Sequence, residues 1–207
     1  VAVTNASGVH GPNIAEYVIG AILSHVRGFG RARRQQDNRV WQSYPARELQ
    51  GSTVTVVGLG AIGSAVVDRL DPFGVETVGV RYTPAKGGPT DAVYGFDELH
   101  AALARTDYLV LACPLTETTA GLIGSDALLT LPTKSFLVIS ARDGFVDNHV
   151  LMDPRQYHLT TLSRIAVTAP TPLHSHSPAC DVSPISFTHD TACNTPRTLA
   201  HQPDISR

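Results

Sequence analysis

The sequence predicts an α/β fold built on a doubly wound parallel sheet. Short apolar runs alternate with amphipathic segments of helical period through the first two thirds of the chain. This order produces right-handed βαβ crossovers and a sheet that helices cover on both faces. The expected strands cover residues 52–57, 76–80, 107–112 and 135–140, and the expected helices between them cover 61–70 and 96–106.

Composition excludes several classes of protein. The chain has 207 residues, 43% of them apolar and 16% charged, and its formal net charge is −2. This charge balance lacks the basic excess that nucleic-acid binding requires. No stretch reaches the ~20 continuous apolar residues of a membrane span, and the start lacks the pattern of a secretory signal. Cys113, Cys180 and Cys193 show no disulfide spacing. We therefore expect a cytoplasmic protein with neither nucleic-acid nor membrane partners.

Composition also changes along the chain, near residue 150. All 17 glycines lie at or before Gly144, whereas seven of the 14 prolines and five of the nine histidines follow residue 150. At the other end, Pro12 precedes apolar residues at helical spacing, which predicts a long helix near 12–34. Such an apolar helix suits a position between domains or subunits, and we expect a homodimer.

The segment "VVGLGAIGSAV" carries the strongest motif. Gly58, Gly60 and Gly63 form G-x-G-x-x-G between an expected strand and an expected helix. In a Rossmann-type dinucleotide-binding domain the first glycine permits the turn, the second admits a pyrophosphate, and the third allows close packing. The pyrophosphate would lie at the start of the helix, at Ala61 and Ile62. The alternative is a purely structural glycine turn.

Arg81 stands at the end of the second expected strand, about 20 residues after the glycines, where an NAD site usually has an acid. Arginine cannot accept a hydrogen bond from a ribose hydroxyl, but its fork suits a 2′-phosphate. We therefore expect NAD(P) as the cofactor, with NADP(H) favoured, and Lys86 adds to the same positive patch. The alternative is a solvated surface arginine.

Four segments in order resemble the D-isomer-specific 2-hydroxyacid dehydrogenase family. They are "VTNASGVHGPNIAEYVIGAIL", "TVVGLGAIGSAV", "CPLTETTAGLIG" and "VISARDGFVD". The resemblance implies a dinucleotide-binding domain over residues 1–190, including the interdomain or dimerisation helix, and a remnant of the substrate domain over 191–207. It also implies that the amino-terminal part of the substrate domain is absent from this chain.

The resemblance assigns roles to two loops at the carboxyl ends of the expected strands. The cofactor would contact Pro114 and Thr119 after one strand, and Ser140, Ala141 and Arg142 after the next. In the family, an arginine at the position of Arg142 binds the carboxylate and carbonyl of a 2-oxo acid, a bidentate task that suits guanidinium. The alternative is that this arginine pairs with one of the nearby aspartates and only closes the loop.

The family completes its chemistry with a histidine general acid and a glutamate that orients it. In the matching register, Thr171 replaces that glutamate and Asp190 occupies the histidine position, with His189 one residue earlier. Ala166 replaces a further expected aspartate. The resemblance thus implies an NAD(P)-dependent oxidoreductase for small 2-oxo and D-2-hydroxy acids, with Arg142 and His189 as its catalytic residues, and the replacements lead us to expect impaired activity. The alternative is a catalytically silent nucleotide-binding or oligomerising module.

A cluster of histidines and cysteines near the end suggests a second alternative, a zinc site. Imidazole and thiolate are suitable ligands, but these spacings match no closed zinc motif. The candidate ligands are His174, His176, Cys180, His189 and Cys193. Solvated loop histidines explain the pattern more simply, and we assign no metal site.

Overall fold

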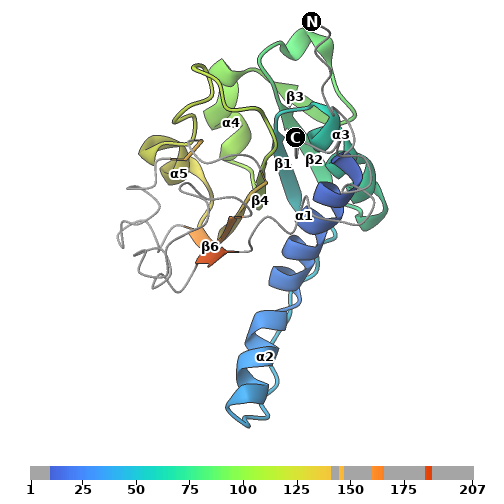
Figure 1. Ribbon diagram of the computed structural model, residues 1–207, viewed down its shortest axis with the longest axis vertical. Coiled ribbons are helices and arrows are strands. Elements are labelled where there is room, and N and C mark those ends of the chain that lie inside the picture. The colour runs from blue at the N-terminus through green and yellow to red at the C-terminus, as the bar shows by residue number, and fades with distance from the viewer. Residues whose placement is uncertain (1–9, 141–144, 147–159, 166–184, 188–207) are drawn as a thin grey trace, which may run out of the picture.

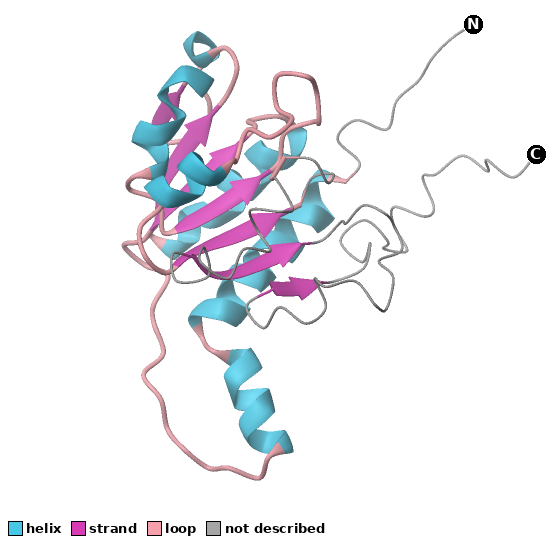
Figure 2. Ribbon diagram, turned by 90° about the vertical axis from the view of Figure 1, so that its left-hand side faces the viewer, coloured by secondary structure: helices cyan, strands magenta, loops and turns pink. Residues whose placement is uncertain are grey.

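A parallel sheet runs through the centre of the molecule, with helices on both faces (Figure 1, Figure 2). The computed structural model describes residues 10–140, 145–146, 160–165 and 185–187. The strands are β1 (Thr53–Val57), β2 (Glu76–Val80), β3 (Ala92–Tyr94), β4 (Tyr108–Leu111), β5 (Ser135–Ile139), β6 (Thr160–Ile165) and β7 (Ile185–Phe187). The α-helices are α1 (Gly11–Val26), α2 (Phe29–Asp37), α3 (Ala61–Leu70), α4 (Leu99–Leu103) and α5 (Ser125–Thr130).

The order of the strands confirms the predicted doubly wound fold. It is β3-β2-β1-β4-β5-β6-β7, and every neighbouring pair is parallel. From β1 the chain winds outward to β3, and it then returns to place β4 on the other side of β1. In open sheets of this kind, ligands bind outside the carboxyl ends of the strands at this reversal point.

Two apolar layers hold the helices against the sheet. Alternate strand residues face opposite sides, so Val110 and Val138 pack towards α1 and α3, whereas Leu109 and Leu137 pack towards α4 and α5. All four side chains are fully buried. Burial on both faces explains why these strands read as continuous apolar runs in the sequence.

The predicted elements agree with the structure to within a few residues, with two exceptions: the helices predicted over residues 96–106 and near 12–34. Residues 96–106 form a short 3-10 turn (Phe96–Glu98) followed by the five-residue helix α4, instead of one longer helix. The strands β3, β6 and β7 and the helix α5 were not predicted. The three-residue strand β3 is only half-buried and so lacks a clear apolar pattern.

The predicted helix near 12–34 is wrong as a single element. It divides into α1 and α2 at Gly28, whose φ of +67° belongs to the left-handed region that favours glycine. A Cβ atom there would also lie 2.7 Å from the Tyr44 ring. Beyond the break, α2 extends past the end of α1 and projects from the body of the molecule (Figure 1). With residues 38–48, which return to the sheet, α2 forms a projection that we call the arm (Figure 2).

The apolar stripe of α1 is buried within the domain. Val18 and Ile22 are fully buried in the layer shared with α3 and the sheet, and none of the residues of α2 is buried. The apolar character of α1 therefore needs no partner subunit to explain it. None of the described helices combines the length and apolar character needed to cross a membrane.

Candidate functional site

The turn between β1 and α3 is fixed by contacts of Gly58. Its φ is +100°, which side chains rarely permit. A Cβ atom at this position would lie 2.6 Å from backbone atoms of Cys113, at the end of β4. The Gly58 N–H donates to the carbonyl oxygen of Val80, at 2.8 Å, at the end of β2. Gly58, which follows β1, therefore contacts the chain at the carboxyl ends of both β2 and β4.

The other two glycines of the motif differ sharply from each other. A Cβ atom at Gly63 would lie 1.9 Å from the carbonyl oxygen of Gly58, so α3 can lie this close to the turn only with glycine there. A Cβ atom at Gly60 would have no neighbour within 4 Å, and its φ of −91° suits any residue. The protein itself therefore requires Gly58 and Gly63, whereas Gly60 borders open space.

That open space adjoins the amino end of α3. The Ser64 N–H makes the first intrahelical bond, to the carbonyl oxygen of Gly60 at 2.9 Å, so the amides of Ala61 and Ile62 precede the helical ladder. No side chain caps this helix end. Amide donors and the positive end of the helix dipole favour an anion at this position.

Arg81 lies directly after β2, at the same edge of the sheet. Its N–H donates to the carbonyl oxygen of Tyr94 at 3.0 Å, and its guanidinium donates to that of Gly87. The side chain is half-buried, whereas Lys86 nearby is exposed. Arg81, the cation predicted to select the cofactor, therefore lies at the carboxyl end of β2, which Gly58 also contacts.

The loop after β4 is organised by Thr119. This threonine is only 4% exposed, and its hydroxyl donates to the carbonyl oxygen of Pro114 at 2.8 Å. The same hydroxyl oxygen accepts from the Thr116 N–H at 2.8 Å. Pro114 itself is exposed. Thr119 therefore positions the loop from inside, and Pro114 lies on the surface that the loop presents.

Two further side chains are buried at the carboxyl ends of β4 and β5. The Ser140 hydroxyl donates to the carbonyl oxygen of Leu111 at 2.9 Å and is 8% exposed as a residue. Cys113 is a free, buried thiol, and this burial raises its pKa to about 11. The thiol is therefore protonated at neutral pH and is no nucleophile.

Two contacts at this edge depend on packing that the sequence did not reveal. The start of α1 meets the start of α3, because a Cβ atom at Gly11 would lie 3.1 Å from the carbonyl oxygen of Ala61. Beside it, the buried Nδ1 of His10 has no hydrogen-bond partner among the described atoms. Leu59 fills the space over Gly79, where a Cβ atom would lie 2.5 Å from its Cδ1.

The remaining predicted site residues lie outside the described residues. These are Ala141, Arg142 and His189, together with the alternative metal ligands at positions 174–193. Within the described part of the chain, no group of three or more histidine, cysteine, aspartate or glutamate residues could hold a metal ion.

Comparison with known proteins settles the family. The model of the D-isomer specific 2-hydroxyacid dehydrogenase NAD binding domain matches residues 19–189. The chain belongs to this family. The resemblance of the four motifs is thus confirmed, and the glycine turn is part of the family's NAD-binding domain.

Relatives of the family agree in sequence and in fold. The chain is 29% identical to a D-3-phosphoglycerate dehydrogenase of Methanocaldococcus jannaschii, over 74% of this chain and 30% of that protein. It is also 29% identical to a hydroxypyruvate reductase of Thermotoga maritima, over 74% of this chain and 50% of that protein. Phosphoglycerate dehydrogenase from Lactobacillus plantarum has a TM-score of 0.86 at 28% identity, with 97% of this chain and 65% of that chain covered. This chain thus spans half or less of the length of the first two relatives.

The contacts of the glycines predict that the same substitution destabilises the protein at one position and has little effect at the other. Gly63→Ala places a methyl group against the Gly58 carbonyl oxygen, so we expect it to lower the free energy of unfolding by about 2–3 kcal/mol. Gly60→Ala meets no protein atom, so we expect it to leave stability nearly unchanged. Denaturant titration of both variants measures this difference. Equal stability of the two variants would contradict the structural distinction between these glycines.

Proposed function

We propose that this chain is the cofactor-binding part of an NAD(P)-dependent oxidoreductase acting on the CH–OH group of small D-2-hydroxy acids. The observation that carries the proposal is the open space at Gly60 beside the uncapped end of α3. The packing of the protein accounts for the other two glycines of the motif but leaves this one unexplained. A pyrophosphate would occupy that space and bind the amides of Ala61 and Ile62.

The cofactor preference rests on Arg81. Its guanidinium already donates to the Gly87 carbonyl oxygen, which orients the side chain at the end of β2. A positive side chain here attracts a 2′-phosphate, and it lacks the acceptor that the 2′-hydroxyl of NAD would need. Pro114 on the loop shaped by Thr119, and Ser140 at the end of β5, would border the rest of the cofactor.

Arg81→Asp is expected to reverse the cofactor preference. The native chain should bind NADPH more tightly than NADH, and the aspartate should repel the 2′-phosphate and accept from the ribose hydroxyls. Arg105→Gln is the matched control, because Arg105 pairs with Glu76 at the opposite end of β2. Fluorescence titration with both cofactors gives the dissociation constants. Tighter binding of NADH than NADPH by the native chain would refute the preference.

The substrate chemistry is assigned through the family. The nicotinamide ring, when bound, supplies the hydride exchanged with the 2-oxo acid. We propose that Arg142 binds the carboxylate of that acid and stabilises negative charge on its carbonyl oxygen, with Ala141 beside the cofactor. His189 would donate the proton, but Asp190 occupies the histidine position of the family and Thr171 replaces the orienting glutamate.

A silent nucleotide-binding or oligomerising module is the second candidate function. The departures at Ala166, Thr171 and Asp190 favour it, because they affect the proton donor and its support but leave the glycine turn intact.

The cytoplasmic location and the domain bounds 1–190 and 191–207 stay predictions.

The two candidate functions differ in turnover. A histidine general acid contributes about 10²- to 10⁴-fold, so we expect the chain to reduce glyoxylate, pyruvate or hydroxypyruvate weakly or not at all. The combined variant Ala166→Asp, Thr171→Glu, His189→Pro and Asp190→His should raise the rate when a family substrate domain is supplied. The absorbance of NADPH reports its oxidation and gives the reaction rates of the native chain and of the combined variant. Strong turnover by the native chain would show that His189 already acts as the acid, and no gain after restoration would favour the silent module.

We propose that the chain forms a homodimer and that the arm makes the contact. The arm carries three of the six large hydrophobic residues that are exposed in the described part of the chain: Phe29, Val40 and Trp41, exposed by 59%, 48% and 102%. Burial of such side chains is a common source of association energy. This location replaces the apolar stripe of α1, which is buried within the domain.

Trp41→Ser is expected to shift the chain from dimer to monomer. Light scattering across a concentration series measures the mass. Leu129→Ser is the control, because this leucine is 53% exposed but lies on α5, away from the arm. A monomeric mass of the native chain at every concentration would contradict the dimer.

A further inference from the structure

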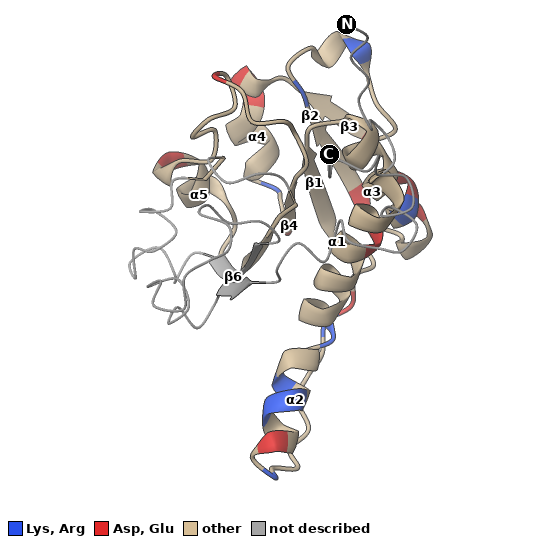
Figure 3. Cartoon of the chain, in the orientation of Figure 1, with Lys and Arg blue, Asp and Glu red and all other residues tan. Residues whose placement is uncertain are grey.

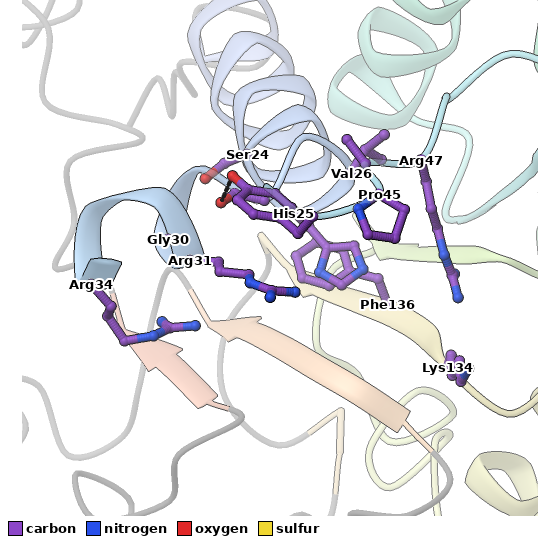
Figure 4. Close-up of a pocket in the computed structure, with 13 residues that line it drawn as sticks. Ser24, His25, Val26, Gly30, Arg31, Arg34, Pro45, Arg47, Lys134 and Phe136 are labelled. Atoms are coloured by element: carbon purple, nitrogen blue, oxygen red, sulfur yellow. Dashed lines mark hydrogen bonds between the residues drawn. The ribbon is translucent and has the colours of Figure 1, made fainter. Parts of the chain in front are cut away.

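A pocket lies where the arm joins the body of the molecule. Its volume is about 460 Å³, and residues of α1, α2, the returning part of the arm and the start of β5 line it. Four of these residues are cationic: Arg31, Arg34, Arg47 and Lys134. Figure 4 shows Arg31 and Arg34 extending from α2, with Arg47 and Lys134 on the other side of the pocket.

The charge of the pocket is local. None of the described residues that line it is acidic, although the whole chain carries a net charge of −2. The arginines of α2 also differ in role: Arg33 pairs with Asp37 at 3.2 Å and lies outside the lining, whereas Arg31 and Arg34 belong to it. The three arginines within α2, coloured blue in Figure 3, are therefore divided between an ion pair and the pocket.

Aromatic contacts make part of this pocket rigid. The His25 ring stacks on Phe136, with centroids 4.3 Å apart and planes at 19°. The Arg31 guanidinium lies 4.6 Å from the centre of the Tyr44 ring, and the Tyr44 hydroxyl donates to the Gly28 carbonyl oxygen at 2.9 Å. A cation–π contact of this kind orients the guanidinium and leaves its N–H groups able to donate at the ring's edge.

Lys134 provides an independent indication. Its φ is +79°, in the left-handed region where residues other than glycine and asparagine are uncommon. The turn before β5 would form more easily with glycine, so the backbone does not explain a lysine there. Strained positions of this kind are concentrated at ligand sites. The strained residue is also one of the four cations that line the pocket.

We propose that this pocket binds a small phosphate-bearing anion. Its wall includes Lys134 and Phe136 at the amino end of β5, whereas the glycine turn lies at the carboxyl ends of the strands. The site is therefore separate from the proposed cofactor site. Several cations with no competing carboxylate among the described lining residues favour a multiply charged phosphate over a monovalent anion.

Calorimetric titration with inorganic pyrophosphate tests the site. We expect the native chain to bind pyrophosphate and the variant Arg31→Gln with Arg34→Gln to bind it roughly tenfold more weakly. Arg33→Gln on the same helix is the control and should change the affinity by less than about twofold. No binding by the native chain, or equal weakening in the variant and the control, would overturn the proposal. Unchanged affinity in the double variant would assign the binding to another site and overturn it as well.

Lys134→Gly separates binding from stability. Glycine relieves the positive φ, so we expect a higher melting temperature, together with weaker pyrophosphate binding because one cation is lost. A higher melting temperature with unchanged affinity would overturn the role of Lys134. Binding that appears only in Trp41→Ser would show that a second copy fills the pocket, and it would also overturn the proposal.

Discussion

The close approach of α3 to the β1 turn is the contact on which the other features of the cofactor site depend. The carbonyl group of Gly58 faces the Cα of Gly63 at a distance that no side chain permits, and Gly58 in turn lies against Cys113. These are contacts between backbones, so they set positions more rigidly than flexible side chains could. The amino end of α3 and the carboxyl ends of β2 and β4 are consequently fixed relative to one another.

The helix α1 reinforces this arrangement from outside. Its buried face shares one apolar layer with α3, and its first turn lies against Ala61. Movement of the amino end of α3 would therefore disturb a buried layer as well as a turn. The arm has the opposite character, since α2 buries none of its residues and is held to the body mainly at its base, through Gly28 and Tyr44.

Hydroxyl side chains at the strand ends act chiefly on the protein backbone. Thr119 and Ser140 each donate to a carbonyl oxygen of their own domain and are largely buried. Their residue types suggest ligand contacts when only the sequence is read, but the structure shows that they shape the loops a ligand would meet. Buried hydroxyls need such partners, because an unsatisfied polar group in the core is costly.

The sequence by itself determined four strands of the sheet, the glycine turn and the position of Arg81, because each follows from a local pattern. Apolar runs define β1, β2, β4 and β5, and the glycine spacing records backbone contacts within six residues. The break at Gly28 escaped prediction because the apolar spacing of α1 gave no sign of the contact with Tyr44. Only the tertiary structure placed α1 against α3 and brought Arg31, Arg47 and Lys134 to one pocket. Lining residues up to 112 positions apart in the chain, Ser24 and Phe136, meet there. No short-range preference encodes such a meeting, which depends on how the helices and the sheet pack.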